Sequence, residues 1–80
     1  MAGLPQVSGR RLIRMLVSVG YVEVRQRGSH VRLTRVTESG QHHITVPDHR
    51  VIAKGTLNDI LTAVSARTSV AKRDLIARLK

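Results

Sequence analysis

The chain of 80 residues contains no cysteine, no tryptophan and no phenylalanine, and Tyr21 is its single tyrosine. Without cysteine it has no disulfide framework, no thiolate nucleophile and no cysteine-ligated zinc site. The scarcity of aromatic rings argues against an RRM-type or OB-type surface, where bases stack on several aromatic side chains. The sequence also lacks an apolar run near about 18 residues and a signal-peptide core. These absences predict a cytoplasmic protein without a membrane span.

Acidic residues are scarce as well. Five Asp and Glu stand against 14 Lys and Arg, which gives a formal net charge of +9. Such a charge favours a polyanionic partner, either a nucleic acid or an acidic protein. Most of the basic residues are arginines, whose planar guanidinium binds phosphate through two parallel hydrogen bonds. Composition alone leaves open the alternative of a solvated basic surface without a specific partner.

The first periodic segment predicts a helix over residues 9–19. Ser8 is a suitable N-cap, and Gly20 stands where a helix-terminating glycine is expected. The apolar residues between them recur at helical spacing and predict the buried side of the helix: Leu12, Met15, Leu16 and Val19.

Residues 21–36 (YVEVRQRGSHVRLTRV) alternate around Gly28-Ser29 and predict a β-hairpin with a type II′ turn. This register sets three pairs across the strands: Arg27 with His30, Arg25 with Arg32, and Val24 with Leu33. One side of the sheet is then apolar, formed by Val22, Val24, Val31 and Leu33. The other side presents Arg25, Arg27, His30 and Arg32. Opposed like charges destabilise a bare sheet, and an anion between them would remove the repulsion.

A third strand is predicted at about residues 42–46, after a turn at 38–41, and Pro47 suits the end of an edge strand. If Thr37 pairs with His42, His43 lies opposite Val36 and roughly 20 Å from His30. Continuing that register past Pro47 would instead set His49 opposite His30. We therefore expect His49, rather than His43, to approach His30.

The C-terminal third predicts two helices. Thr56 is the expected N-cap of the first, with Asp59 in a capping-box position and a buried stripe of Leu57, Ile60, Leu61 and Val64. The second begins at Thr68 or Ser69, with Ala71, Leu75 and Leu79 four residues apart.

The predicted fold is α+β, an α-β-β-β-α domain with a three-stranded antiparallel sheet, similar to the double-stranded-RNA-binding domain. Residues 1–80 form one domain, with a core at about 8–64 and a short helical extension at 67–80.

Three segments together resemble the HicA toxins of bacterial and archaeal toxin–antitoxin systems: SGRRLIRMLVSVGYVEVRQRGSHVRL, ITVPDH and KGTLNDIL, in that order over residues 8–64. The resemblance implies an mRNA interferase, the toxin of a type II system, which cleaves RNA and arrests growth until a HicB antitoxin neutralises it. The family's essential histidine is that of its G-S-H motif, which is His30 here. We expect the antitoxin to cover the Arg25–Arg32 face.

The residues fit metal-independent RNA cleavage. A base must take the proton of the 2′-hydroxyl, and histidine titrates near neutral pH, so His30 is the candidate general base and acid. Arg25, Arg27 and Arg32 would hold the phosphate, Gly28 would leave the turn backbone open, and Ser29 would donate a hydrogen bond. His49 is a candidate second proton donor, and a histidine that only bonds its own loop is the alternative. The carboxylates are scattered, so no metal or other cofactor is expected. A non-catalytic RNA- or DNA-binding module on the same fold is the alternative function.

Overall fold

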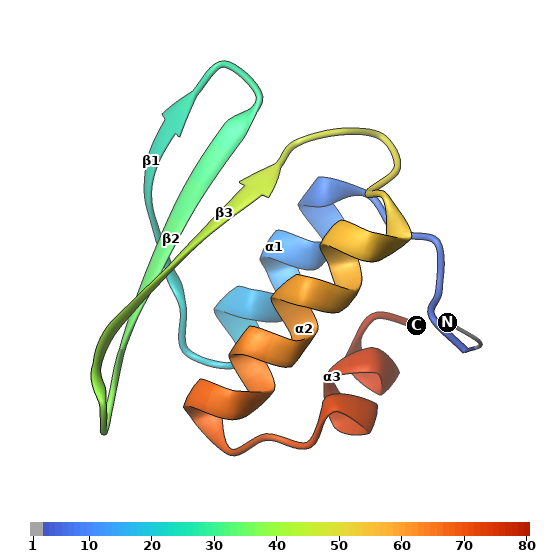
Figure 1. Cartoon of the computed structure of the whole chain (residues 1–80). Coiled ribbons are helices and arrows are strands. Elements are labelled where there is room, and N and C mark those ends of the chain that lie inside the picture. Colours follow the sequence, from blue (N-terminus) through green and yellow to red (C-terminus); the bar gives the residue numbers. More distant parts are fainter. Residues whose placement is uncertain (1–2) are drawn as a thin grey trace.

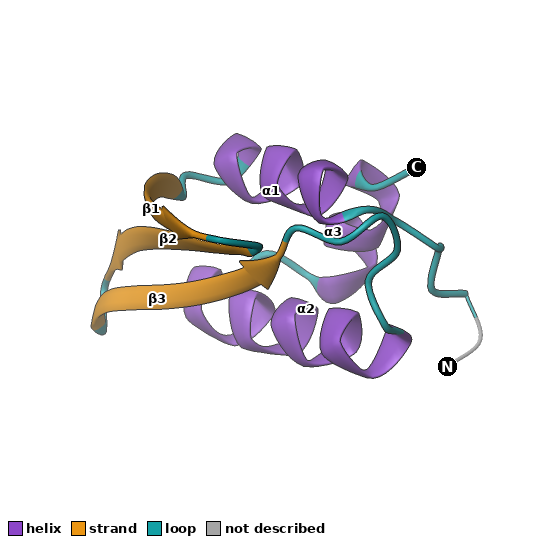
Figure 2. Cartoon of the chain, turned by 90° about the horizontal axis from the view of Figure 1, so that it is seen from above, coloured by secondary structure: helices purple, strands orange, loops and turns teal. Residues whose placement is uncertain are grey.

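A computed structural model describes residues 3–80 and arranges three helices on one side of a three-stranded sheet (Figures 1 and 2). The sheet is antiparallel with strand order β1-β2-β3. This architecture confirms the predicted α+β class and its α-β-β-β-α order with a further C-terminal helix. The elements are α1 (Gly9–Ser18), β1 (Val22–Arg27), β2 (His30–Thr37), β3 (Gly40–Pro47), α2 (Lys54–Thr68) and α3 (Lys72–Arg78).

Both ends of α1 form as the sequence predicts. The Ser8 hydroxyl accepts a hydrogen bond from the Arg11 backbone N–H at 3.1 Å, which satisfies one of the free donors of the first turn. Gly20 has φ +100°, a conformation that glycine adopts without strain, and the chain reverses there into β1. Tyr21 follows and is almost fully buried.

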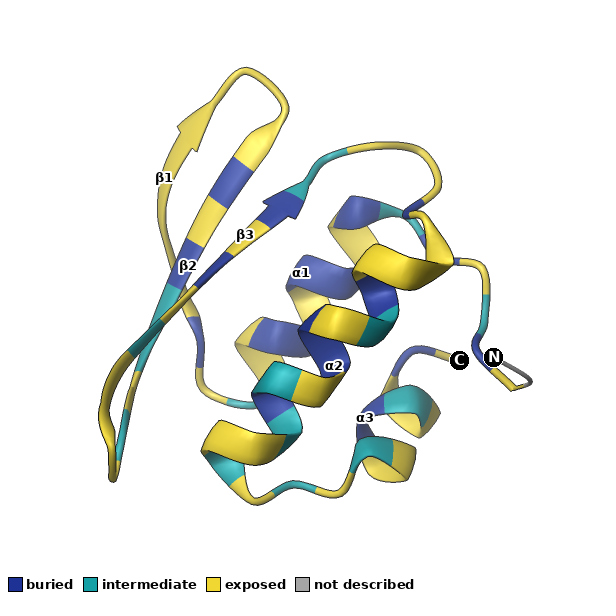
Figure 3. Cartoon of the chain, in the orientation of Figure 1, coloured by how far each residue is buried: buried dark blue, intermediate teal, exposed yellow. Residues whose placement is uncertain are grey.

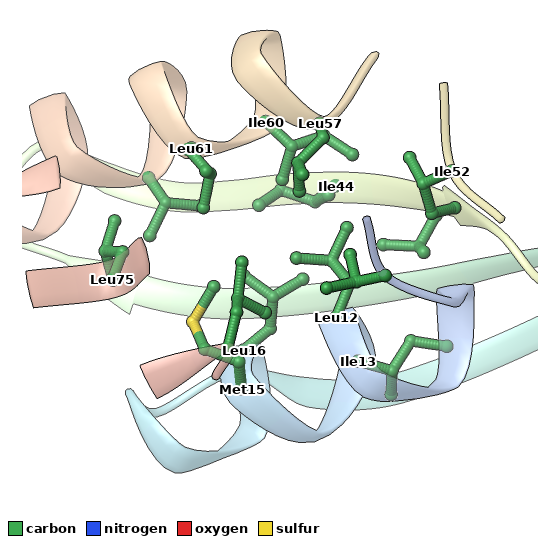
Figure 4. Packing of buried hydrophobic residues seen from close by; sticks show 14 of the residues in the cluster. Leu12, Ile13, Met15, Leu16, Ile44, Ile52, Leu57, Ile60, Leu61 and Leu75 are labelled. Carbon is green, nitrogen blue, oxygen red and sulfur yellow. The ribbon is translucent and has the colours of Figure 1, made fainter. Parts of the chain in front are cut away.

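One face of the sheet packs against the helices and the other lies open. Alternate residues of β2 and β3 point into the core, so the buried set is Val31, Leu33, Ile44 and Val46. They join one hydrophobic cluster with the stripes of α1 and α2 (Figure 4). The residues between them form the open face, and Figure 3 shows the β1–β2 hairpin as almost wholly exposed apart from its inward β2 positions.

The predicted pairing of β1 holds from Arg25 to Arg27 and is wrong for the residues that precede Arg25. The register shifts between Glu23 and Arg25, so Leu33 pairs with Glu23 instead of Val24. The extra residue is a β-bulge, which turns the remaining side chains of the strand by one position. Val22 and Val24, predicted as core, are 61% and 55% exposed. The helix-facing positions of β1 are polar, and they bind an arginine of α1 rather than a hydrophobic core.

The second hairpin closes earlier than the sequence predicts. Thr37 pairs with Gly40, not with His42, so the turn is only Glu38-Ser39 and β3 starts two residues sooner. Gly40 has φ +107°, which permits the tight closure. As a result His43 lies opposite Thr34 instead of Val36. Pro47 ends the strand, as predicted.

Helix α2 starts two residues before the expected cap. Its N-cap is Ala53, without a side-chain hydrogen bond, so the predicted Thr56 cap and Asp59 capping box are wrong. Ile52 is buried and its N–H bonds the Val7 carbonyl at 2.8 Å, which fixes the chain just before the helix. The helix can then begin at once, with the Leu57 N–H bonded to the Ala53 carbonyl. The predicted buried stripe of α2 is confirmed.

The last helix also starts later than predicted, because α2 continues through Thr68. Ser69 then takes the left-handed conformation with φ 62° and α3 follows at Lys72. Leu75 and Leu79 are buried in the common core as expected. The Leu79 carbonyl accepts a 2.7 Å hydrogen bond from the Arg11 guanidinium, so the C-terminal segment is tied to α1.

Gly9 marks the closest approach between α1 and the end of β3. A Cβ at this position would lie 2.8 Å from Asp48 Cα and closer still to the Pro47 carbonyl oxygen. The Gly9 N–H bonds the His49 carbonyl at 2.9 Å, so the helix cannot easily move away. Gly9→Ala is expected to cost about 1–3 kcal/mol of unfolding free energy, measured by urea denaturation. Gly55→Ala is the control, because nothing lies within 4 Å of its Cβ and stability should hold or rise. An equal response of both variants would contradict this close packing.

Candidate functional site

A shallow hollow of about 180 Å³ lies on the open face of the sheet and is lined by residues from all three strands. The lining residues are Arg25, Arg27, His30, Arg32 and Thr45. Every one of them is exposed. Among residues 3–80 no helix covers this face, so a chain-like ligand has free access to it (Figure 2).

The hairpin geometry that gathers these side chains was predictable from its turn. Arg27 pairs with His30 and Arg25 pairs with Arg32, as the Gly28-Ser29 turn requires. Gly28 has φ +55° while Ser29 is outside the positive-φ region, which fits a type II′ turn. Three guanidinium groups therefore surround one imidazole on a water-exposed surface. An anion placed among them would remove the repulsion between the opposed arginines.

Thr45 is the lining residue that the sequence reasoning missed. It stands opposite Arg32 on β3, so its hydroxyl adds a neutral hydrogen-bonding group to a charged hollow. Its place depends on the pairing of β2 with β3. Gly40 was the sequence signal for this pairing. It closes the turn so that Thr37 pairs with Gly40 instead of His42, which shifts the β2–β3 register by two residues.

The other predicted site residues lie around the hollow rather than in its lining. Gly28 and Ser29 form the turn at its edge, where the Ser29 carbonyl accepts the Asp48 N–H at 2.5 Å. The strand ends with Pro47 opposite His30, so the ladder does not extend to His49. His49 is exposed on the following loop, and its carbonyl accepts the Gly9 N–H. Its role as a second proton donor stays a prediction.

Arg10 of α1 ties the hairpin to the rest of the fold. Its guanidinium donates to Asp48 Oδ2 from Nε at 3.2 Å and contacts the same oxygen from Nη2 at 3.2 Å. It also donates to Gln26 Oε1 at 3.2 Å, and the Gln26 amide in turn donates to the Gly28 carbonyl at 3.1 Å. Arg10 is therefore linked to the Gly28-Ser29 turn through two residues. Asp48 bonds the Ser29 carbonyl through its N–H, and Gln26 bonds the Gly28 carbonyl through its amide. Sequence periodicity did not single out Arg10, which falls outside the predicted buried side of the helix.

Arg10→Gln is expected to loosen the hairpin without unfolding the protein. The side chain is about half exposed, so its ion pairs are partly screened and the loss of unfolding free energy should stay near or below about 1 kcal/mol. Amide hydrogen exchange between residues 25 and 32 should become faster. Arg14→Gln is the matched control on the same helix, and unchanged exchange in both variants would rule out the tethering role.

Two further histidines lie on opposite faces of β3. His43 is on the open face and its Nδ1 is 2.7 Å from the Thr34 hydroxyl. His42 is on the helix side, where its Nδ1 is 2.6 Å from the Tyr21 hydroxyl. Burial, with Arg67 and His43 nearby, lowers the pKa of His42, and burial raises the pKa of Tyr21. The His42 pair therefore belongs to the packing between sheet and helices.

Two kinds of site are absent from the described chain. Within residues 3–80 no three side chains of His, Asp or Glu converge in a way that could hold a metal ion. None of the helices in that range is long and apolar enough to cross a membrane.

The comparison with known families agrees with the motifs around the hairpin. A family model described as the HicA toxin of bacterial toxin–antitoxin matches residues 9–65. Neither a curated protein nor a solved structure matches the chain. The matched segment runs from the glycine that packs against β3 to the last turns of α2, and it includes the whole hairpin with His30. Because it spans well over half of the sequence, the chain belongs to the HicA toxin family of bacterial toxin–antitoxin systems.

Proposed function

We propose that this toxin is a metal-independent endoribonuclease that cleaves mRNA, with His30 as the general base. The observation that supports this most directly is the hollow on the open face, where one histidine lies among Arg25, Arg27 and Arg32. Arginines bind phosphate oxygens through charge-assisted hydrogen bonds, and neutral histidine accepts a proton near pH 7. Family membership supports the toxin role, and the hollow supports the chemistry.

The proposed reaction needs one proton acceptor and a phosphate clamp. His30 removes the proton of a ribose 2′-hydroxyl, and the 2′-oxygen attacks the adjacent phosphorus. The bond to the 5′-oxygen breaks, so the products end in a 2′,3′-cyclic phosphate and a 5′-hydroxyl. The arginines neutralise the charge that builds on the non-bridging oxygens. The proton for the leaving oxygen comes from water or from His49, the candidate second donor.

Neighbouring groups would position the RNA. Gly28 has no side chain, and nothing lies within 4 Å of its missing Cβ, so the backbone of the turn is open to a ligand. The Ser29 hydroxyl and the Thr45 hydroxyl are further donors to phosphate or ribose oxygens. None of these groups is arranged to distinguish one base from another.

The same face is the proposed binding surface of the antitoxin. A HicB-type protein with acidic residues would form ion pairs with the Arg25–Arg32 face and exclude RNA from His30. Opposite charges accelerate such an encounter, so association of the two proteins should slow as salt is added. An antitoxin that binds this face would block RNA cleavage without any change in the fold of the toxin.

The purified protein should cut a mixed-sequence RNA in the presence of EDTA and leave 2′,3′-cyclic phosphate ends. A substrate with a single 2′-deoxynucleotide at the cleaved position should bind with similar affinity and stay intact, because the attacking oxygen is missing. Loss of cleavage on chelation, or cutting of the 2′-deoxy substrate, would overturn the proposed chemistry.

A non-catalytic RNA- or DNA-binding module is the second candidate function. It is favoured by one observation: among the described residues, the hollow is lined by one histidine with three arginines and a threonine, so no second acid–base group accompanies His30 there. This alternative predicts salt-dependent nucleic-acid binding and intact RNA even at high protein concentration. The EDTA assay above separates the two functions.

A further inference from the structure

We propose that the protein has a second anion site, at the opposite end of the sheet from the Gly28-Ser29 turn, which binds a phosphate group between Arg35 and Arg67. A hollow of about 260 Å³ lies there between the Glu38-Ser39 turn and the C-terminal end of α2. Figure 1 shows this turn and this helix end at the same end of the molecule. Nothing in the proposed RNA cleavage uses these residues.

Arg35 provides the first indication of a missing ligand. Its position on β2 alternates with Leu33, so its side chain lies on the helix side of the sheet. Nη1 of its guanidinium is buried and has no hydrogen-bond partner among the described residues. A buried donor without an acceptor is costly and rare in folded proteins, and an unseen ion or water is a common explanation. The guanidinium is thus placed for an acceptor that the chain itself does not supply.

The chain makes room for this arginine at Gly20. A Cβ on Gly20 would lie 3.0 Å from Nε and 3.3 Å from Cδ of Arg35. The glycine that ends α1 therefore also allows the arginine side chain to pass over the backbone. The guanidinium therefore lies directly beside the backbone of the turn between α1 and β1.

Arg67 brings a second positive charge to the same hollow. It lines the hollow from the last turn of α2, and it acts together with Arg35 on the buried Tyr21, whose pKa both arginines lower against the larger effect of burial. In the described part of the chain neither arginine forms an ion pair with a carboxylate. Two guanidinium groups that line one hollow and form no ion pair there are suited to bind a phosphate.

Two features of the hollow oppose an anion, and both are weaker than the arginines. The C-terminal end of α2 is the negative end of the helix dipole, equivalent to roughly half a negative elementary charge. The two arginines carry two full positive charges. Glu38 also lines the hollow, but it is exposed on the turn, so water screens its charge. Glu38 therefore competes with the ligand for the arginines. Its removal should strengthen phosphate binding, whereas removal of an arginine should weaken it.

The second site is separate from the first. Arg35 is five positions beyond His30 on β2, about 16 Å along the strand, and its side chain points to the opposite face. The phosphate could come from a distant nucleotide of a bound RNA that passes round the β2–β3 turn, or from a free phosphate monoester. The first source rests on the proposed function, whereas the second does not.

Titration with inorganic phosphate, followed by NMR, tests the site itself. We expect saturable shifts at the backbone amides of residues 37–39 and 66–69, and a rise in the pKa of His42, because a bound anion offsets the positive charge of Arg67. Arg67→Gln should weaken this binding about tenfold or more, and Glu38→Gln should strengthen it several-fold. Arg73→Gln, an exposed arginine on α3, is the control and should change nothing.

The outcomes separate a real site from a basic surface. Equal, weak responses in the wild type and in all three variants would overturn the proposal, as would shifts confined to the hairpin around His30. Arg35→Lys provides a second variant, since it keeps the charge but not the buried Nη1 donor, and binding should still fall. Tighter binding in Glu38→Gln cannot come from a general loss of folding.

A second pair of assays identifies the source of the phosphate. If the ligand is RNA, Arg67→Gln should raise the KM for a long RNA and leave the KM for a dinucleotide unchanged. If the ligand is a free monoester, adenosine monophosphate should bind the wild type more tightly than Arg67→Gln, with both RNA substrates unaffected. Failure of all RNA cleavage would count against the proposed function only, because the phosphate titration does not depend on it. Protection of residues 66–69 by an acidic antitoxin peptide and not by phosphate would assign the hollow to a protein partner and overturn the phosphate site.

Discussion

Replacement of His30 by alanine is expected to lower RNA cleavage by a factor of about 10²–10⁴ while RNA affinity and thermal stability change little. His30 is exposed at the start of β2, so its side chain contributes little buried area to the fold. The arginines around it remain in place, so the proposed phosphate contacts are kept. The variant loses only the proposed proton acceptor, so the loss is expected in kcat rather than in KM.

His43→Ala is the matched control for this experiment. His43 lies on the same open face, but it bonds Thr34 and does not line the hollow, so its removal should leave cleavage within about twofold of the wild type. His49→Ala distinguishes the two sources of the second proton: a large fall in kcat indicates His49, and an unchanged kcat indicates water. If His30→Ala cleaves RNA as fast as the wild type, His30 is not the base.

The second large effect is expected in stability, from Leu75→Ala. Leu75 is fully buried and lies in α3, beyond the residues that match the toxin family, yet it belongs to the common core (Figure 4). Truncating a buried leucine costs about 2–5 kcal/mol, through lost burial and the cavity that remains. A small domain has a free energy of unfolding of only about 5–15 kcal/mol, so the variant should lose a large part of it.

Denaturant unfolding with matched variants measures this effect. Ile76→Ala is the control, because Ile76 is only partly buried, and its loss should be clearly smaller than that of Leu75→Ala. Removal of residues 69–80 should abolish the cooperative transition, since it takes away both Leu75 and Leu79 together with the bond from Arg11 to the Leu79 carbonyl. Equal stability of Leu75→Ala and the wild type would mean that α3 does not stabilise the core.

Sequence reasoning succeeded where structure is determined by neighbours in the chain. The Gly28-Ser29 turn fixes which residues face each other nearby, so the pairs Arg27–His30 and Arg25–Arg32 were predictable. It failed at Val24, because regular alternation does not reveal a β-bulge. The register shift between Glu23 and Arg25 leaves Glu23 and Gln26 on the helix side, where polar contacts to Arg10 replace the expected apolar ones.

The start of α2 was also predicted wrongly, because contacts between distant parts of the chain override the local capping signal. Thr56 and Asp59 form a good local capping signal, but buried Ile52 fixes the chain earlier and α2 starts at Lys54. Residue type and turn geometry were enough to predict that His30 lies among Arg25, Arg27 and Arg32 on one face of the sheet. Thr45 and Arg10 were not predictable in this way, because their positions depend on the β2–β3 register and on the packing of α1 against β1.

The bulge near Val24 also affects how copies of this protein meet one another. β1 is an edge strand, and a straight edge with exposed valines is a template for pairing with a second chain and for aggregation. The shifted register interrupts the regular row of free backbone groups, and Arg25 and Arg27 add repulsion between two such edges. At the other edge, β3 ends with a proline that has no N–H to donate. Both free edges of the sheet therefore carry features that disfavour pairing with the edge strand of a second copy.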